Sequence, residues 1–200
     1  GTKEKNFWIM EQQSGITGWE CMGRAPKPGQ LSMWSVQSSA HGADTVVYFR
    51  WRVCTVGTEQ YWHGILPHSG KPGRRYEELK AFIHKMRPLM AEIQGVSPKP
   101  EVGIVFSYDQ EYAMQIQPHN PKLTYIGQVM KYYTGFYNKN IPVDFVSDQS
   151  DFSRYKLLIA PLQYLMDPAL EKKYADYVRS GGHLVLTMRT GVKDRNNICM

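Results

Sequence analysis

Short runs of consecutive apolar residues mark the strands expected in the first part of this chain. Residues 7–10 (Phe-Trp-Ile-Met) form one run, which ends at the acidic Glu11, and residues 45–49 form a second, which ends at Arg50. Runs of this length, rich in β-branched and aromatic side chains, are typical of buried strands. We therefore predict two buried strands, separated by a loop rich in glycine and proline and a polar segment, residues 30–43, that is compatible with a helix.

Apolar residues then recur at helical spacing between residues 76 and 93. They are Leu79, Phe82, Ile83, Met86, Met90 and Ile93, which predicts a helix with its apolar face packed inward. Pro88 lies inside this pattern. Because proline lacks the N–H that an interior helical position donates, we expect the helix to kink or restart near His84. The order strand, helix, strand, helix is the βα rhythm of a parallel sheet.

The same rhythm continues after residue 100. Apolar runs predict strands at residues 102–106, 143–146, 157–160 and 183–188, with a helix over residues 123–137. Asp167-Pro168 predicts the start of a further helix, because aspartate caps a helix N-terminus and proline suits its first turn. Its inward face is expected to consist of Leu170, Tyr174, Tyr177 and Val178, and Gly181-Gly182 to end it.

The chain divides near residue 96. All five tryptophans lie in the first third, and residues 95–100 (Gly-Val-Ser-Pro-Lys-Pro) have the composition of a linker. We predict two domains, residues 1–96 and residues 97–200. The last predicted strand comes shortly before Met200, earlier than an open α/β sheet is usually complete, and the chain starts at Gly1 rather than methionine. We therefore expect it to be part of a longer protein.

Composition excludes several classes of protein. With 42% hydrophobic and 21% charged residues among 200, a sizeable core is expected, and no apolar stretch approaches the ~18 residues of a membrane span. The net charge of +6 is scattered rather than concentrated on one element, so we expect no nucleic-acid partner. Cys21, Cys54 and Cys199 form no disulfide or zinc pattern, which favours the cytoplasm.

Cofactor motifs are absent from the sequence. No G-x-G-x-x-G follows a strand and no phosphate-binding P-loop occurs, so we expect no nucleotide cofactor. No G-x-[SC]-x-G nucleophile elbow is present either. His63 and His68 lie five residues apart in a loop without a third ligand, so we expect them to form hydrogen bonds rather than to hold a metal.

Acidic, amide and aromatic residues remain as candidates for chemistry. Glu11 follows an apolar run, at the carboxyl edge where parallel α/β folds carry reacting groups. The residues that could join it to bind sugar hydroxyls or cover a sugar ring are Gln12, Gln13, Trp19, Arg50, Glu59 and His63. From residue types alone an alternative stays open, in which Glu11 and Glu59 are solvated loop acids and the tryptophans belong to the core.

Four sequence blocks carry a resemblance to a known family. They are residues 10–19 (MEQQSGITGW), 28–29 (PG), 39–52 (SAHGADTVVYFRWR) and 57–64 (GTEQYWHG). In this order they resemble the C-terminal part of glycoside hydrolase family 42, the bacterial β-galactosidases. The second half resembles that family's trimerisation domain, a flavodoxin-like or glutamine-amidotransferase-like fold without amidotransferase chemistry.

The resemblance implies an α/β fold: the last βα units of a (β/α)₈ TIM barrel, with strands seven and eight and the last helix, followed by a partial flavodoxin-like open parallel sheet. It also implies a retaining enzyme that needs no cofactor and forms a homotrimer. Glu11 would be the nucleophile, Trp19 would contact the sugar, and Phe49 and Arg50 would line the galactose pocket. Glu59 and His63 would hydrogen-bond its hydroxyls.

The resemblance further implies what is missing from these 200 residues. The family's acid/base glutamate lies on the fourth barrel strand, so residues 1–200 alone are expected to be inactive on the β-galactoside substrate. Two other functions remain open. The second half could serve as an oligomerisation module, or the tryptophans could bind sugar without catalysis.

Overall fold

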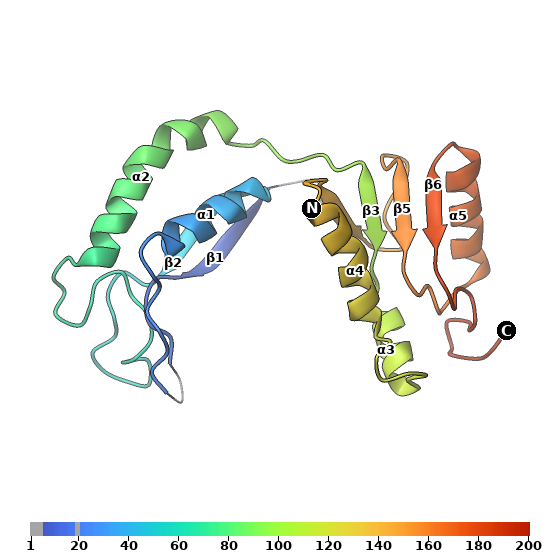
Figure 1. The fold of residues 1–200 in the computed structure, drawn as a ribbon, viewed down its shortest axis with the longest axis horizontal. Coiled ribbons are helices and arrows are strands. Elements are labelled where there is room, and N and C mark those ends of the chain that lie inside the picture. Colours follow the sequence, from blue (N-terminus) through green and yellow to red (C-terminus); the bar gives the residue numbers. More distant parts are fainter. Residues whose placement is uncertain (1–5, 19–20) are drawn as a thin grey trace. The chain divides into compact units, whose positions relative to one another are not determined.

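The computed structural model of the chain describes residues 6–18 and 21–200 (Figure 1). The chain folds as two compact units, of which the first ends at Pro98 and the second begins at Lys99. Each unit contains its own parallel sheet. In the described residues, no helix is both long enough and apolar enough to cross a membrane.

The first unit consists of two strands and two helices. They are β1 (Phe7–Gln13), α1 (Gln30–Ala40), β2 (Ala43–Phe49) and α2 (Arg74–Ile93). β1 and β2 pair in parallel, and α1 packs against β2 and α2. Leu31 of α1 and Leu79 of α2 are buried in this layer. The strand–helix–strand–helix order predicted from the apolar pattern is confirmed.

The prediction that both strands are buried is wrong. Trp8 and Met10 are 61% and 65% exposed, and Val47 of β2 is also exposed. The described residues provide only this one strand pair, with α1 against β2, so much of the sheet has no covering layer. An apolar run shows that its side chains favour burial. Whether they are buried depends on a neighbouring element that covers them.

A β-bulge interrupts β1 at Glu11. Ile9 pairs with Val46 and Gln12 pairs with Tyr48, so Met10 and Glu11 stand opposite a single residue of β2. A bulge breaks the strict alternation of side chains and re-aims the residues in it. β1 also continues to Gln13. Glu11 therefore lies within the strand, on the bulge, and not at its end as we predicted.

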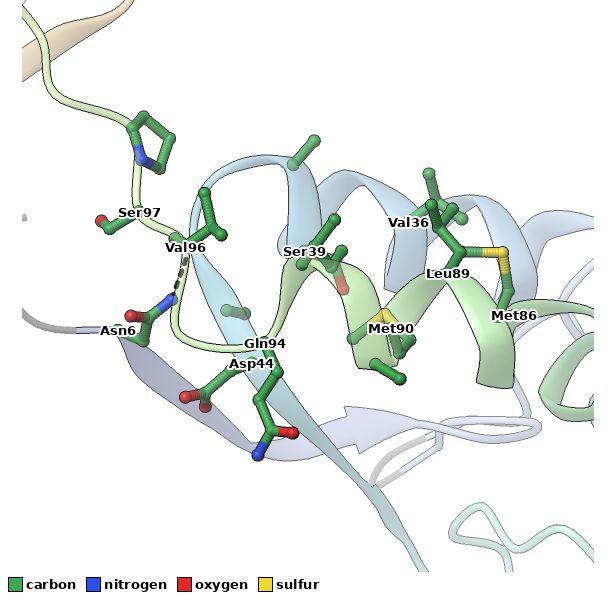
Figure 2. Close-up of a pocket in the computed structure, with 15 residues that line it drawn as sticks. Asn6, Val36, Ser39, Asp44, Met86, Leu89, Met90, Gln94, Val96 and Ser97 are labelled. Carbon is green, nitrogen blue, oxygen red and sulfur yellow. Dashed lines mark hydrogen bonds between the residues drawn. The ribbon is translucent and has the colours of Figure 1, made fainter.

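Helix α2 runs without a break through Pro88, so the predicted restart near His84 is wrong. Both residues are exposed, and water can therefore satisfy the His84 carbonyl that loses its N–H donor. Of the predicted inward face, only Leu79 is fully buried. Part of the rest lines an open groove of about 700 Å³, in which Met86 and Met90 of α2 and Val36 of α1 are among the lining residues (Figure 2).

The second unit is a four-stranded parallel sheet with helices on both faces. Its elements are β3 (Val102–Val105), α3 (Tyr108–Ile116), α4 (Tyr125–Tyr137), β4 (Val143–Val146), β5 (Leu157–Ala160), α5 (Pro168–Arg179) and β6 (His183–Leu186). The strand order is β4-β3-β5-β6, which is the 2-1-3-4 order of flavodoxin-like folds. All four strands, α4 and α5 were predicted from the sequence, whereas α3 was not.

Side chains alternate between the two faces of this sheet. Ile104 and Ile159 pack with residues of α3 and α4, whereas Val105 and Leu158 pack with residues of α5. α3 and α4 therefore cover one face and α5 covers the other. Strands buried on both faces read as continuous apolar runs, which is why they were recognisable in the sequence.

Helix α5 begins at the cap that the sequence predicted. The Asp167 carboxylate accepts a hydrogen bond from the Leu170 N–H at 2.7 Å and one from Arg195 Nε at 2.7 Å. These two hydrogen bonds, the one from the backbone first, hold the pKa of Asp167 below its ordinary value. Leu170, Tyr174 and Tyr177 are buried as predicted. Val178 is 47% exposed, so its predicted inward position is wrong.

Replacement of Asp167 by Ala is expected to lower the free energy of unfolding of this unit by about 1–2 kcal/mol at pH 7, because the first turn of α5 loses its cap. The folded pKa of Asp167 lies below the unfolded one. The part of its contribution that depends on the charge is therefore complete above the unfolded pKa, and that part is lost as the pH falls below about 4 through the folded value. Urea unfolding followed by far-UV circular dichroism at pH 7 and pH 3 measures both effects.

The variant Asp167→Asn is the matched control, because its amide oxygen still accepts the Leu170 N–H while the charge facing Arg195 is removed. It is expected to retain most of the stability. Equal losses for the Ala and Asn variants at pH 7 would contradict a capping role for this side chain.

Candidate active site

Glu11 and His63 form the centre of the candidate site. The His63 side chain is 2% exposed, and its Nε2 lies 3.8 Å from Glu11 Oε1, whose side chain is 56% exposed. This distance is longer than a hydrogen bond, so both groups remain available to hydrogen-bond a ligand. A buried imidazole thus faces an accessible carboxylate. The sequence predicted both residues but could not show that they face each other.

The carbonyl oxygen of Phe49 fixes the orientation of His63. It lies in close contact with His63 Nδ1 and accepts a hydrogen bond from Ser14 Oγ at 2.6 Å. The Ser14 backbone N–H also donates to this Nδ1 at 3.5 Å, so two backbone groups hold one ring nitrogen while the other, Nε2, faces Glu11. Ser14 is fully buried. It follows β1 and thereby ties the end of that strand to the end of β2.

Aromatic contacts hold the same imidazole from two sides. The Phe49 ring meets it edge-on, with centroids 5.6 Å apart and planes at 85°, and the Trp62 ring packs 4.9 Å from it. The peptide bond between Phe49 and Arg50 is cis. Neither Ser14 nor Trp62 was among the residues assigned to the site from sequence. Both lie within blocks that carried the resemblance, Ser14 in residues 10–19 and Trp62 in residues 57–64.

Arg50 and Glu59 form a second pair beside this centre. Arg50 Nη1 donates to Glu59 Oε2 at 3.2 Å, and the guanidinium carbon lies 5.6 Å from the centre of the Phe49 ring. The two side chains are 38% and 35% exposed. An exposed pair of this kind contributes only about 0–1 kcal/mol to stability. Its main effect is to hold the Glu59 carboxylate in place at an accessible position.

Other candidates from the sequence make local hydrogen bonds or cannot be placed. Trp19 lies outside the described residues. Gln13 donates to the Gly15 carbonyl within its own loop, and His68 Nε2 contacts the Gln60 carbonyl at 2.6 Å. Within residues 6–18 and 21–200, no three His, Cys, Asp or Glu side chains come together as a metal site.

Comparison with known proteins agrees with this architecture. The fold is an α/β arrangement that combines the last βα units of a (β/α)₈ barrel with a flavodoxin-like domain. A family profile described as "Beta-galactosidase" matches residues 1–89, and one described as "Beta-galactosidase trimerisation domain" matches residues 100–200. The chain belongs to glycoside hydrolase family 42, as the sequence blocks predicted.

Two similar proteins are β-galactosidases by name. The chain is 41% identical to β-galactosidase BgaA of Clostridium cellulovorans over 201 residues, which cover 100% of this chain and 30% of that protein. It is 38% identical to BgaH of Haloferax lucentense, covering 98% of this chain and 29% of that protein. The chain therefore spans about 30% of the length of these relatives.

Solved structures show the same relationship. The β-galactosidase from Halorubrum lacusprofundi superimposes with a TM-score of 0.88 and 34% identity, covering 99% of this chain and 29% of the other. The enzyme from Bacillus circulans sp. alkalophilus superimposes with a TM-score of 0.89 and 29% identity, covering 98% of this chain and 29% of the other.

Proposed function

We propose that these 200 residues are the C-terminal part of the catalytic barrel, residues 1–96, and the first part of the trimerisation domain, residues 97–200, of a retaining β-galactosidase. Glu11 is the nucleophile in this proposal. The observation that supports it is the accessible Glu11 carboxylate on the bulge of β1, 3.8 Å from an imidazole that is buried and fixed by Phe49. The names of the relatives supply the substrate class, terminal β-D-galactosides.

The reaction has two displacements. A Glu11 carboxylate oxygen attacks the anomeric carbon, the bond from that carbon to the leaving oxygen breaks, and a second carboxyl protonates that oxygen. The resemblance places this second carboxyl on the fourth barrel strand. The same group then takes a proton from water, whose oxygen attacks the anomeric carbon and releases Glu11. The product is galactose with its original configuration.

The surrounding residues have binding roles in this scheme. His63 Nε2 and the Glu59 carboxylate can hydrogen-bond sugar hydroxyls, since one is held by Phe49 and the other by Arg50. Phe49 and Arg50 line the pocket, and Trp19 covers the sugar ring. Such contacts accelerate the reaction to the extent that they strengthen as positive charge develops on the sugar.

Covalent trapping tests the nucleophile. A full-length family member containing these residues is expected to be inactivated by a 2-fluoro-galactoside with a good leaving group, because fluorine slows release of the glycosyl enzyme more than its formation. Mass spectrometry of the digested protein should find the sugar on the peptide containing Glu11. The peptide containing Glu59 serves as an internal control, and a label there or elsewhere would move the nucleophile away from Glu11.

We also propose that the protein forms a homotrimer and works in the cytoplasm. The family description of residues 100–200 supports the first statement. The second is supported by Cys21, Cys54 and Cys199, all of which are free thiols. A protein that serves only in assembly or only in sugar binding would acquire no label in the trapping experiment. Binding of galactose without labelling would identify the sugar-binding role.

A further inference from the structure

Helix α3 presents a row of large apolar side chains to solvent. Tyr108, Tyr112 and Ile116 follow one another at intervals of four residues, which places them on one side of the helix. Their exposed fractions are 64%, 56% and 71%. We refer to these three residues as the α3 stripe. Ile126 and Met130 of α4, the neighbouring helix on the same face of the sheet, are also exposed.

The stripe is held in one arrangement by the packing beneath it. The Tyr108 ring lies 5.1 Å from Phe106 and 6.1 Å from Tyr112, edge-on to the first and stacked with the second. On the inward side of α3, Gln110 is fully buried and exchanges two hydrogen bonds with the Leu165 backbone, at 3.0 and 2.7 Å. Rings held in place by packing lose little conformational freedom when a partner covers them.

The opposite face of the same sheet differs in character. On α5, the Asp176 carboxylate pairs with Lys172 at 2.5 Å and with Arg179 at 3.0 Å, and all three side chains are well exposed. A helix surface with interlocking charges is typical of contact with water. Tyrosine, by contrast, is enriched at protein–protein interfaces. Of the two helical layers of this unit, the α3 layer therefore has the composition of an interface.

We propose that the α3 stripe is a surface through which this chain contacts a second copy of itself in a homotrimer. The stripe lies within residues 100–200, the segment that matches the trimerisation domain of the family. The inference thus rests on the proposed assembly and identifies the side chains that carry it. In a closed three-fold ring each contact joins two different patches of neighbouring copies. One change in the stripe is consequently repeated at all three contacts.

Sedimentation velocity of the 200-residue chain tests the surface. The wild-type chain is expected to sediment at three times its monomer mass of 23.1 kDa. The double variant Tyr108→Ser/Tyr112→Ser is expected to associate at least about a hundredfold more weakly, and so to sediment as a monomer at micromolar concentration. The single variant Ile116→Lys, which places a charge in the same surface, should have the same effect and guards against misfolding of the double variant.

Val178→Ser is the matched control, because Val178 is an exposed apolar residue on α5, on the opposite face of the sheet. It should leave the trimer intact, and circular dichroism should show equal helix content in all variants. A trimer that persists in both folded α3 variants would overturn the proposal for the stripe while leaving trimerisation in place. The proposal would also be overturned if Met188→Ser, at an exposed position after β6, dissociated the trimer while the α3 variants did not.

A wild-type chain that is monomeric throughout this concentration range would overturn both the stripe and the trimer formed by this part of the chain. It would not affect the assignment of the nucleophile, which the trapping experiment measures separately.

Discussion

A polypeptide consisting of residues 1–200 alone is expected to hydrolyse a nitrophenyl β-galactoside no faster than buffer does. A full-length family member containing the same residues is expected to hydrolyse it readily. The reason is that retaining cleavage requires two carboxyls about 5 Å apart, one to attack and one to protonate the leaving oxygen. In our proposal Glu11 supplies the first, and the resemblance implies that the second lies on the fourth barrel strand.

The open sheet of the first unit adds a second reason. Trp8, Met10 and Val47 are exposed on a strand pair that lacks further covering elements in the described residues. A complete barrel can enclose a galactose pocket, which excludes water and orients the sugar ring. A single strand pair cannot enclose such a pocket. Release of nitrophenol at both low and high concentrations of the purified polypeptide is the measurement, with circular dichroism to confirm that the polypeptide is folded.

Turnover that rises in proportion to the concentration of this polypeptide, and that disappears on Glu11→Gln substitution, would contradict the proposal. It would mean that a second carboxyl within residues 1–200 can act as the acid. Glu59 would then be the residue to examine, because Arg50 already holds it beside Phe49 in the same site.

The second unit was more predictable from sequence than the first. Its inner strands β3 and β5 are covered on both faces, and Leu158 and Ile159 are buried, whereas Val185 and Leu186 of the edge strand β6 stay exposed. In the first unit the same kind of run predicted the strands correctly and their burial wrongly. Periodicity is a property of the segment, whereas burial depends on elements elsewhere in the chain.

Helix α3 shows a different kind of miss. Ser107 caps it by accepting the Asp109 N–H at 3.2 Å, and glutamine follows at residue 110. Serine followed three residues later by glutamine is a sequence pattern typical of a helix start. The signal was therefore present. We missed it because the exposed face carries tyrosines. With aromatic residues on that face, the segment lacks the usual division into an apolar and a polar side.

The site shows what sequence can and cannot predict. Each of Glu11, Arg50, Glu59 and His63 was predicted from its residue type and its block, and the structure brings them together as two pairs linked through Phe49. The pairing depends on the bulge in β1 and on the parallel register with β2. Neither feature leaves a pattern in the sequence, since a bulge adds one residue without requiring a special residue type.

In a full-length family member containing this sequence, Glu11→Gln is expected to lower kcat by about 10⁴-fold or more, the range seen when a catalytic side chain is removed. The amide has nearly the volume of the carboxylate but is a very poor nucleophile, so the glycosyl enzyme does not form. Glu11 is 56% exposed and its carboxylate lies 3.8 Å from His63, beyond hydrogen-bond distance, so folding should be little affected. The matched control Glu101→Gln, at an exposed carboxylate of the second unit, should retain full activity.

Rescue by a small anion distinguishes a nucleophile from a residue that only orients the substrate. In the smaller variant Glu11→Ala, azide can enter the vacated space, attack the anomeric carbon from the same side and expel the leaving group, which gives an α-galactosyl azide. Activity with an activated galactoside should therefore return in proportion to azide concentration, with this azide as the product. If azide restores nothing to Glu11→Ala, or if Glu11→Gln alters KM while leaving kcat unchanged, then Glu11 binds the sugar and another residue attacks it.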